Sequence, residues 1–226
     1  MPPKSATHVW KSVADVKRVW FVRKQGKEVT LNQGGEARII LGRVLFKDGK
    51  RHPIAIKYFH TPIKDSVAER YTEVIEKLRA AKVRTAKMAM MKIPTERSPN
   101  GEWVQISEAF GSNFNKIKLN PALWGDLQTI QQKTAAMTEL CKIAKAGLYP
   151  AIDAIEGIQG KNEAIVVDIG SLIKLRTPAR CAQGLFFAIS MMTADIHERS
   201  QLIQYVSQSI RTNPELFEPW KTLIAK

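Results

Sequence analysis

The period of the apolar positions changes along the chain, and each change predicts a change of secondary structure. From residue 8 to residue 24 apolar side chains recur at helical spacing, which predicts an amphipathic N-terminal helix. From residue 28 to residue 59 β-branched residues dominate between turn residues, which predicts a three-stranded antiparallel meander. The strands are predicted at 28–33, 37–46 and 52–59, and the turns contain Gly34-Gly35 and Asp48-Gly49.

The helical period returns at residues 65–81, and strands are predicted again after it. Four apolar residues three or four positions apart make one face of this helix: Val67, Tyr71, Val74 and Leu78. Two more strands are predicted at 86–94 and 102–110, joined by a turn at 98–101. The first half of the chain therefore has the predicted order β-β-β-α-β-β.

The second half of the chain is predicted to be mostly helical. Residues 121–146 predict one or two helices that end near Gly147. A short β excursion follows at 154–170, with its turn at 160–162. From residue 179 to residue 225 the pattern is helical again, with a break at Pro214-Glu215. The sequence shows no internal repeat. No low-complexity linker separates its two halves.

Composition excludes extensive disorder and points to anionic partners. The chain has 226 residues, of which 44% are hydrophobic and 25% charged, values typical of a folded protein. Lys and Arg exceed Asp and Glu by 35 − 21 = 14. Such a charge favours an acidic protein partner, phosphate-bearing ligands, an anionic membrane face or nucleic acid. The basic residues are scattered, so a well-solvated surface is the alternative, and nucleic-acid binding rests on charge alone.

The cysteines and the termini indicate a cytoplasmic protein. Cys141 and Cys181 are far apart in apolar contexts, which predicts reduced core residues. The four histidines are isolated and suggest no metal cluster. The chain shows no apolar run of membrane-spanning length and no secretory signal. A secretion system that reads a disordered N-terminus leaves no such mark, so a role as an effector delivered into a host cell stays open.

Two short segments carry candidate chemistry. In the predicted strand around Ile54-Ala55-Ile56-Lys57, alternation puts Ala55 and Lys57 on one face. The small alanine leaves room for a flat ligand, and the lysine offers an ammonium to phosphates, although a solvent-facing edge lysine is the alternative. Asp168 ends the apolar run 164–167, where it either caps the next turn or binds a ligand.

The order of these parts resembles the protein kinase superfamily. Ile-Ala-Ile-Lys stands where kinases have V-A-I-K, and Asp168-Ile169-Gly170 stands where they have D-F-G. The resemblance spans about residues 28–175. It implies a two-lobed α+β fold, with a five-stranded antiparallel sheet plus one Glu-bearing helix, followed by a reduced, mostly helical C-terminal lobe. The implied lobes cover 28–111 and 112–226, after an extension of residues 1–27.

The resemblance also implies a nucleotide site for ATP and Mg²⁺. Asp168 would bind Mg²⁺, Lys57 would contact the α- and β-phosphates, and Glu73 would orient Lys57. The backbone of Gly34 and Gly35 would approach the phosphates. The adenine would lie near Ala55 and bind the backbone of a hinge at 105–110, which includes Glu108 and Phe110.

The chain departs from the kinase pattern where catalysis is concerned. No H-R-D-x-x-x-x-N precedes Asp168, and no A-P-E follows it. Asp153 is the residue that would accept or orient the substrate hydroxyl proton, although a turn cap is its alternative role. Glu156 or Gln159 would be the second metal ligand.

The sequence therefore predicts a minimal ATP/Mg²⁺-dependent phosphotransferase of atypical protein-kinase type, acting on a protein hydroxyl. The alternatives are a pseudokinase that binds a protein partner and nucleotidyl transfer by the same fold.

Overall fold

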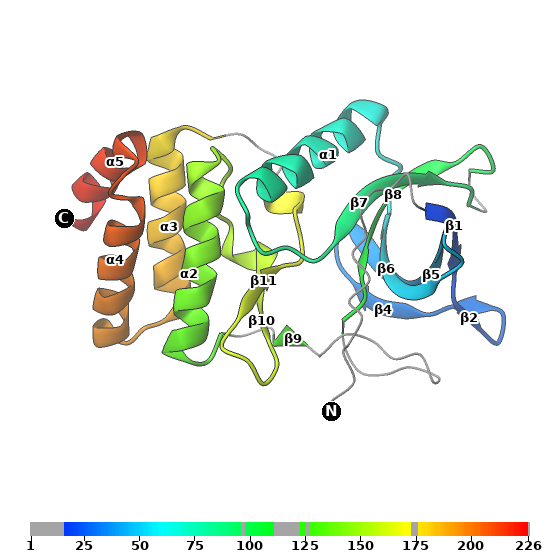
Figure 1. The fold of residues 1–226 in the computed structure, drawn as a ribbon, viewed down its shortest axis with the longest axis horizontal. Coiled ribbons are helices and arrows are strands. Elements are labelled where there is room, and N and C mark those ends of the chain that lie inside the picture. The colour runs from blue at the N-terminus through cyan, green and yellow to red at the C-terminus, as the bar shows by residue number, and fades with distance from the viewer. Residues whose placement is uncertain (1–15, 96–97, 111–122, 125–126, 173–175, 226) are drawn as a thin grey trace. The chain divides into compact units, whose positions relative to one another are not determined.

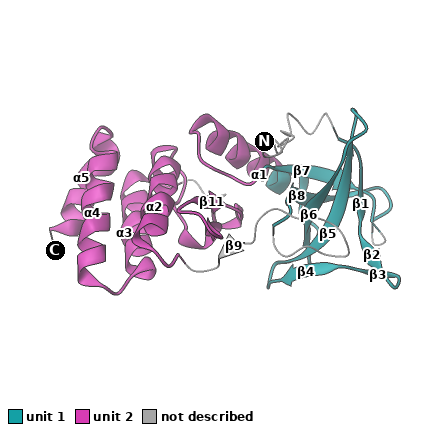
Figure 2. Ribbon diagram, turned by 60° about the horizontal axis from the view of Figure 1, so that its bottom comes forward, with its two compact units in different colours: residues 1–68, 87–120 teal, residues 69–86, 121–226 magenta. Residues whose placement is uncertain are grey.

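The computed structural model describes residues 16–95, 98–110, 123–124, 127–172 and 176–225. It divides into two compact units, coloured separately in Figure 2. Unit 1 comprises residues 1–68 and 87–120, and unit 2 comprises residues 69–86 and 121–226. The contacts thus group residues 69–86 with the second unit, whereas the sequence boundaries put this segment with the sheet.

Unit 1 is built on a curled antiparallel sheet (Figure 1). Its described strands are β1 (Val16–Phe21), β4 (Thr30–Gln33), β5 (Ala37–Phe46), β6 (Arg51–Phe59), β7 (Met88–Ile93) and β8 (Glu102–Glu108). The order is β1-β5-β6-β8-β7, and β4 also pairs with β5. The predicted strands at 37–46, 52–59, 86–94 and 102–110 are confirmed within two residues at each end. The described sheet has six strands where five were predicted, because β1 is added.

The extra strand corrects the predicted N-terminal helix. Val16–Phe21 is strand β1, and it pairs with β5, while residues 8–15 lie outside the described residues. Val16, Val19 and Phe21 pack against the core of the sheet. The helical prediction was wrong for these residues because the backbone groups of β1 bond to β5, and such tertiary pairing overrides a short periodic pattern.

One edge of β5 pairs with two strands, β1 and β4, and a hairpin lies between these two strands along the chain. β1 pairs along one part of β5 and β4 along the other. Between them, β2 (Arg23–Lys24) and β3 (Lys27–Glu28) form a hairpin. The N–H of Val22 donates to Leu41 O, and the N–H of Leu41 donates to Val29 O. The backbone ladder of β5 therefore continues across the interruption.

The two faces of the sheet carry two different apolar clusters. Ile54 and Ile56 are fully buried in the larger cluster. Ala55 belongs to a smaller cluster, whose buried members are Val29, Leu41 and Ala109. The predicted alternation of Ile54 and Ile56 against Ala55 is confirmed.

Unit 2 contains a group of helices and a small antiparallel sheet (Figure 1). Its helices are α2 (Ile130–Lys145), α3 (Pro178–Met192), α4 (Ile196–Ile210) and α5 (Pro214–Ile224), with most of α1 (Asp65–Ala80). The sheet has the order β11-β10-β9, formed by β11 (Ala164–Val166), β10 (Ile155–Ile158) and β9 (Leu123–Trp124). The short 3₁₀ turns η2 (Ile152–Ala154) and η3 (Gly170–Leu172) flank the β10–β11 hairpin.

Two details of the predicted helices differ. The segment predicted as helical from residue 121 forms a helix only from Ile130, where the side chain and backbone of Thr129 complete a capping box with Gln132. The segment 179–225 is broken twice, because Asp195 caps α4 and Asn213 caps α5. The first of these breaks was not predicted.

The predicted α+β class, with an antiparallel sheet ahead of a mostly helical half, is confirmed. Cys141 and Cys181 are free and buried, as predicted. Among the described residues, no helix is long and apolar enough to cross a membrane.

Candidate functional site

In unit 1, Lys57 lies on β6 between two neighbouring strands. It is opposite Ile39 of β5 and Gln105 of β8, and its Nζ lies 5.9 Å from the centroid of the Phe59 ring. Two residues before it, Ala55 packs with Leu41 and Ala109. Period-two alternation puts Ala55 and Lys57 on the same face. A small apolar platform and an ammonium group therefore share one face of the sheet.

The predicted hinge begins inside a central strand. β8 lies between β6 and β7 and pairs with both, so the backbone groups of residues 105–108 belong to the ladders of the sheet. The Glu108 carboxylate accepts a hydrogen bond from the Lys87 N–H at 3.0 Å and lies 3.5 Å from Lys87 Nζ. Only Ala109 and the half-buried Phe110 follow the strand within the predicted hinge. Backbone that binds a ligand there must therefore come after Glu108.

The glycine pair forms the β4–β5 turn, as predicted. The N–H of Gly34 donates to Ala37 O, and His60 Nε2 lies 2.9 Å from Gly34 O, where it acts as a donor to the carbonyl. A methyl group added at Gly35 would have no heavy atom within 4 Å. Hydrogen bonds thus fix the backbone of the turn at Gly34, whereas the space beside the Cα atom of Gly35 is unoccupied by the described residues.

Gln105 lies on the same face of the sheet as Ala55 and Lys57. The sequence predicted it only as the first residue of the hinge. It is opposite Lys57, and its side chain is 2% exposed. Its Nε2 lies 3.7 Å from Met88 Sδ, whereas its Oε1 is buried without a hydrogen-bond partner in the described part of the chain. The signal in the sequence was a glutamine between apolar residues of a central strand.

Glu73 lies on α1 with its side chain exposed. It belongs to unit 2, whereas Lys57 belongs to unit 1. The orienting role of Glu73 toward Lys57 stays a prediction.

In unit 2, the structure brings Asp153 and Asp168 into neighbouring segments. The N–H of Asp168 donates to Ala154 O at 3.4 Å, and Val167 N donates to the same carbonyl at 2.8 Å. The Ser171 hydroxyl donates to Asp153 Oδ2 at 2.8 Å. Both aspartates therefore lie at the open end of the β10–β11 hairpin.

The carboxylate of Asp168 makes the turn contact expected of a cap. Its Oδ1 accepts the N–H of Gly170 at 2.8 Å, at the first residue of η3. Ile169, next to it, is fully buried and anchors the turn. The cap fixes the direction of the side chain, and it uses one lone pair of a group that has several.

The other two candidate metal ligands lie farther along the same hairpin. Glu156 is on β10, opposite Ile165, and is half-buried. Gln159 is exposed at the turn, five residues beyond Ala154, which corresponds to roughly 16 Å along an extended strand. The structure thus brings Glu156 near the aspartates and does not bring Gln159 near them.

The loop before Asp153 is held by a close contact with α3. A methyl group at Gly184 would lie 2.9 Å from Tyr149 Cε2 and 3.0 Å from the Pro150 ring. The Cys181 thiol also lies 3.4 Å from Leu148 O and donates to it. Only a residue without a side chain allows this approach, so Gly184 helps to position η2 and Asp153.

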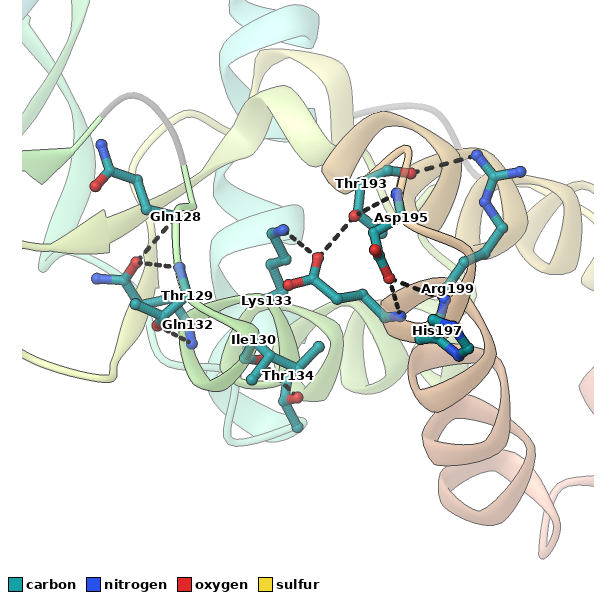
Figure 3. Close-up of polar contacts among 11 residues, drawn as sticks. Gln128, Thr129, Ile130, Gln132, Lys133, Thr134, Thr193, Asp195, His197 and Arg199 are labelled. Atoms are coloured by element: carbon teal, nitrogen blue, oxygen red, sulfur yellow. Dashed lines mark hydrogen bonds and ion pairs between the residues drawn. The ribbon is translucent and has the colours of Figure 1, made fainter.

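A second polar cluster in unit 2, which we call the α2–α4 corner, is formed by Lys133, Thr193, Asp195, Glu198 and Arg199. Figure 3 shows its polar contacts. Lys133 Nζ lies 2.5 Å from Glu198 Oε2, which also accepts the Thr193 hydroxyl at 2.7 Å. The hydrogen bonds from Lys133 and Thr193 lower the pKa of Glu198. Asp195 Oδ1 accepts two backbone N–H groups of α4, of which that of Glu198 contributes most to a lowered pKa.

Metal-ligating side chains are sparse in the described residues. They contain no group of three or more His, Cys, Asp or Glu residues placed to hold a metal ion. Mg²⁺ bound with ATP needs only one or two protein carboxylates, because phosphate oxygens and water supply the rest. The pair of Asp153 and Asp168 fits that requirement.

Comparisons with known proteins add little about activity. No protein-family model matches the chain, and no curated protein matches it in sequence. Among solved structures, the one described as WaaP in complex with acyl carrier protein has a TM-score of 0.43 and 10% sequence identity, over 88% of each chain. A likeness at these values supports no argument about function.

Proposed function

We propose that the chain is an ATP- and Mg²⁺-dependent phosphotransferase of minimal protein-kinase type that acts on a protein hydroxyl. The observation that carries the proposal is the pair of aspartates at the open end of the β10–β11 hairpin, where Asp168 accepts the N–H of Gly170 and Asp153 accepts the Ser171 hydroxyl. Asp168 lies two residues after the buried strand β11, and Asp153 lies in the neighbouring segment η2. Two carboxylates so placed suit a metal–nucleotide complex and an acceptor hydroxyl.

In the proposed reaction, the acceptor oxygen bonds to the γ-phosphorus while the bond from that phosphorus to the leaving ADP oxygen breaks. Asp153 accepts or orients the hydroxyl proton, and Asp168 binds Mg²⁺. Asp168 would hold Mg²⁺, which would supply positive charge against the negative charge that develops during transfer. Within unit 1, Lys57 offers an ammonium of the kind that binds phosphates, and Ala55 with Leu41 and Ala109 offers an apolar surface of the kind that binds adenine.

A specific observation favours a second candidate, nucleotide binding without transfer. Asp153 and Asp168 belong to segments that backbone hydrogen bonds join at Ala154, and in this candidate both carboxylates bind the same Mg²⁺. Asp153 would then not be free to take a proton. In that case the chain is a pseudokinase that binds a protein partner.

Thermal unfolding with nucleotide and metal tests the shared part of both candidates. We expect ATP with Mg²⁺, at about 100-fold above its Kd, to raise the unfolding midpoint by about 5 °C or more. Asp168→Ala should abolish the Mg²⁺-dependent part of the rise in the unfolding midpoint. Lys57→Ala should reduce the total rise. Asp48→Ala is the matched control, because Asp48 is an exposed carboxylate of the β5–β6 turn. Absence of a shift with any divalent metal would overturn the proposal.

Transfer of label from ATP then separates the candidates. Label that passes from the γ-phosphate to a protein and is lost in Asp153→Ala, while the thermal shift persists, identifies Asp153 as the proton acceptor. A thermal shift that is itself lost in Asp153→Ala, without transfer by the unmodified protein, identifies the binding-only protein. Label that passes from the α-phosphate would identify nucleotidyl transfer.

A further inference from the structure

A cavity of about 450 Å³ lies within unit 2, beside Asp153. Its walls come from three separate parts of the chain: the segment before α2, the η2–β10 segment and the C-terminal end of α3. The residues that matter below are Leu127, Asp153, Glu156, Met191 and Met192, and two isoleucines complete the lining. This volume is within the range of pockets that hold small ligands or single side chains. We call it the 153–156 pocket.

The polar part of the pocket is anionic, in a chain of net charge +14. The lining contains two carboxylates, Asp153 and Glu156, and none of its residues is basic. Glu156 is half-buried, and no hydrogen bond or ion pair joins its carboxylate to another residue that the structure describes. Burial raises the pKa of this carboxylate. A charged group that is partly withdrawn from water without a partner is costly, and a cation from a ligand would offset this cost.

The apolar part of the pocket suits an aliphatic stem. Met191 and Met192 are flexible, polarisable side chains that adapt to different shapes. The apolar surface continues outside the pocket, since Phe187, Met191 and Ile196 are 55%, 63% and 64% exposed. Lys and Arg side chains combine such a stem with a cationic end. Flanking apolar residues of a bound peptide would contact the outer surface.

Two contacts keep the walls in place without a ligand. Met192 is followed by Thr193, which is tied into the α2–α4 corner through Glu198 and Lys133. On the opposite wall, Leu127 lies against β10, where a methyl group at Gly157 would approach its Cδ2 to 3.2 Å. A preformed pocket binds with a smaller entropic cost than one that must be ordered.

We propose that the 153–156 pocket binds the ammonium or guanidinium group of a basic side chain near the acceptor hydroxyl of a protein substrate. The cation lies between Asp153 and Glu156, and its stem lies along Leu127, Met191 and Met192. The assignment to a substrate rests on the proposed phosphotransfer, whereas the cation site itself does not depend on nucleotide.

NMR of the full chain, labelled at the methionine methyl groups, tests the site without ATP or metal. The probes are n-butylammonium and n-butylguanidinium, and 1-butanol is the neutral probe of similar shape. We expect saturable shifts of the Met191 and Met192 signals with both cations and at least about fivefold weaker binding of butanol. Glu156→Gln, which conserves shape, should weaken binding of the cations about fivefold. Glu215→Gln, an exposed carboxylate on α5, is the matched control and should leave the affinity unchanged.

Two outcomes would overturn the cation site: equal binding of butanol and butylammonium, or unchanged affinity in folded Glu156→Gln protein. If Glu156→Gln fails to fold, Met191→Ser, at an exposed position, takes its place, with Met192 as reporter and the same expected loss. A serine peptide in which lysine is replaced by norleucine tests the substrate assignment, and it should be phosphorylated several-fold more slowly. Since the NMR experiment needs no nucleotide, cation binding without ATP binding rejects the phosphotransferase alone, and the reverse result rejects the pocket alone.

Discussion

Unit 2 contains two polar clusters whose carboxylates differ in the contacts that they make. In the α2–α4 corner, Lys133 and Glu198 bond to each other, and Glu198 also accepts the hydroxyl of Thr193 in the turn between α3 and α4. At the open end of the β10–β11 hairpin, Asp153 accepts the Ser171 hydroxyl and Asp168 accepts the N–H of Gly170. A carboxylate oxygen that accepts a hydroxyl or a backbone N–H retains a further lone pair that can bind a ligand. Charge alone therefore does not separate a structural cluster from a candidate site, and the kind of contact that each carboxylate makes is the better guide.

The comparison predicts opposite effects of substitution in the two clusters. In the corner, substitutions should lower stability and leave ligand binding intact. At the aspartates, they should change ligand binding and leave stability nearly unchanged.

Lys133→Met should give the largest loss of stability. Lys133 is 7% exposed, and its removal leaves the Glu198 carboxylate without its cation. We expect the unfolding midpoint to fall by about 5 °C, measured by calorimetry. Lys221→Met is the control, because Lys221 forms an ion pair with Glu218 at an exposed site of α5, and its midpoint should stay within about 1 °C. Equal effects in the two variants would remove the distinction between the clusters.

Gly184→Ala should give a smaller loss of stability and a clear loss of nucleotide response. The added methyl group overlaps Tyr149 and Pro150, so we expect a cost of about 1 kcal/mol in urea unfolding. The displaced loop carries Asp153, so the ATP·Mg²⁺ thermal shift should fall too. Ser190→Ala, at an exposed position of the same helix, should change neither quantity. A variant with unchanged nucleotide response would show that this loop does not position Asp153.

The pH dependence of stability should give the smallest effects, with opposite signs in the two clusters. The pKa of Glu198 is lowered in the folded chain, so its contribution is present above about pH 4.5 and is lost as the pH falls further. The pKa of Glu156 is raised by burial, so its contribution is present below about pH 4.5 and is lost as the pH rises. Urea unfolding of Glu198→Gln between pH 3 and pH 7 should show a flatter acid limb. Glu156→Gln should be slightly more stable than the unmodified protein at pH 7. A steeper acid limb in Glu198→Gln would contradict the lowered pKa.

The sequence predicted the central elements of the sheet well, because their patterns are local. The strands around Ile40 and Ile56 alternate clearly, and the turn residues at Asp48-Gly49 delimit them. Strand β1 was missed because its valines also fit a helical period, and only pairing with β5 decides between the two. The break before α4 had a signal in Asp195 and Glu198, an N-cap with an acidic first turn.

Residues of the candidate site could be predicted from the sequence only where a single short segment contains them. Asp153 and Asp168 were selected through the resemblance to the kinase pattern, and the structure places them at the two ends of one short hairpin. Gln159 was selected by its spacing from Asp153, and a strand in an extended conformation carries it away from the hairpin base. The pocket at Met191 could not be predicted, since its walls come from three segments far apart in the sequence.

Unit 2 is discontinuous in the sequence, and this has a consequence for the order of folding. Residues 84–86 pair with β11 through hydrogen bonds between Ala86 N and Val166 O and between Val166 N and Arg84 O. The chain between them includes two strands of unit 1. Contacts between residues far apart in sequence form slowly because the intervening loop must first close. During synthesis, residues 84–86 therefore stay unpaired until the hairpin that carries Asp168 has been made. The outer edge of β11, with which they pair, is the last part of that hairpin to be protected from other chains.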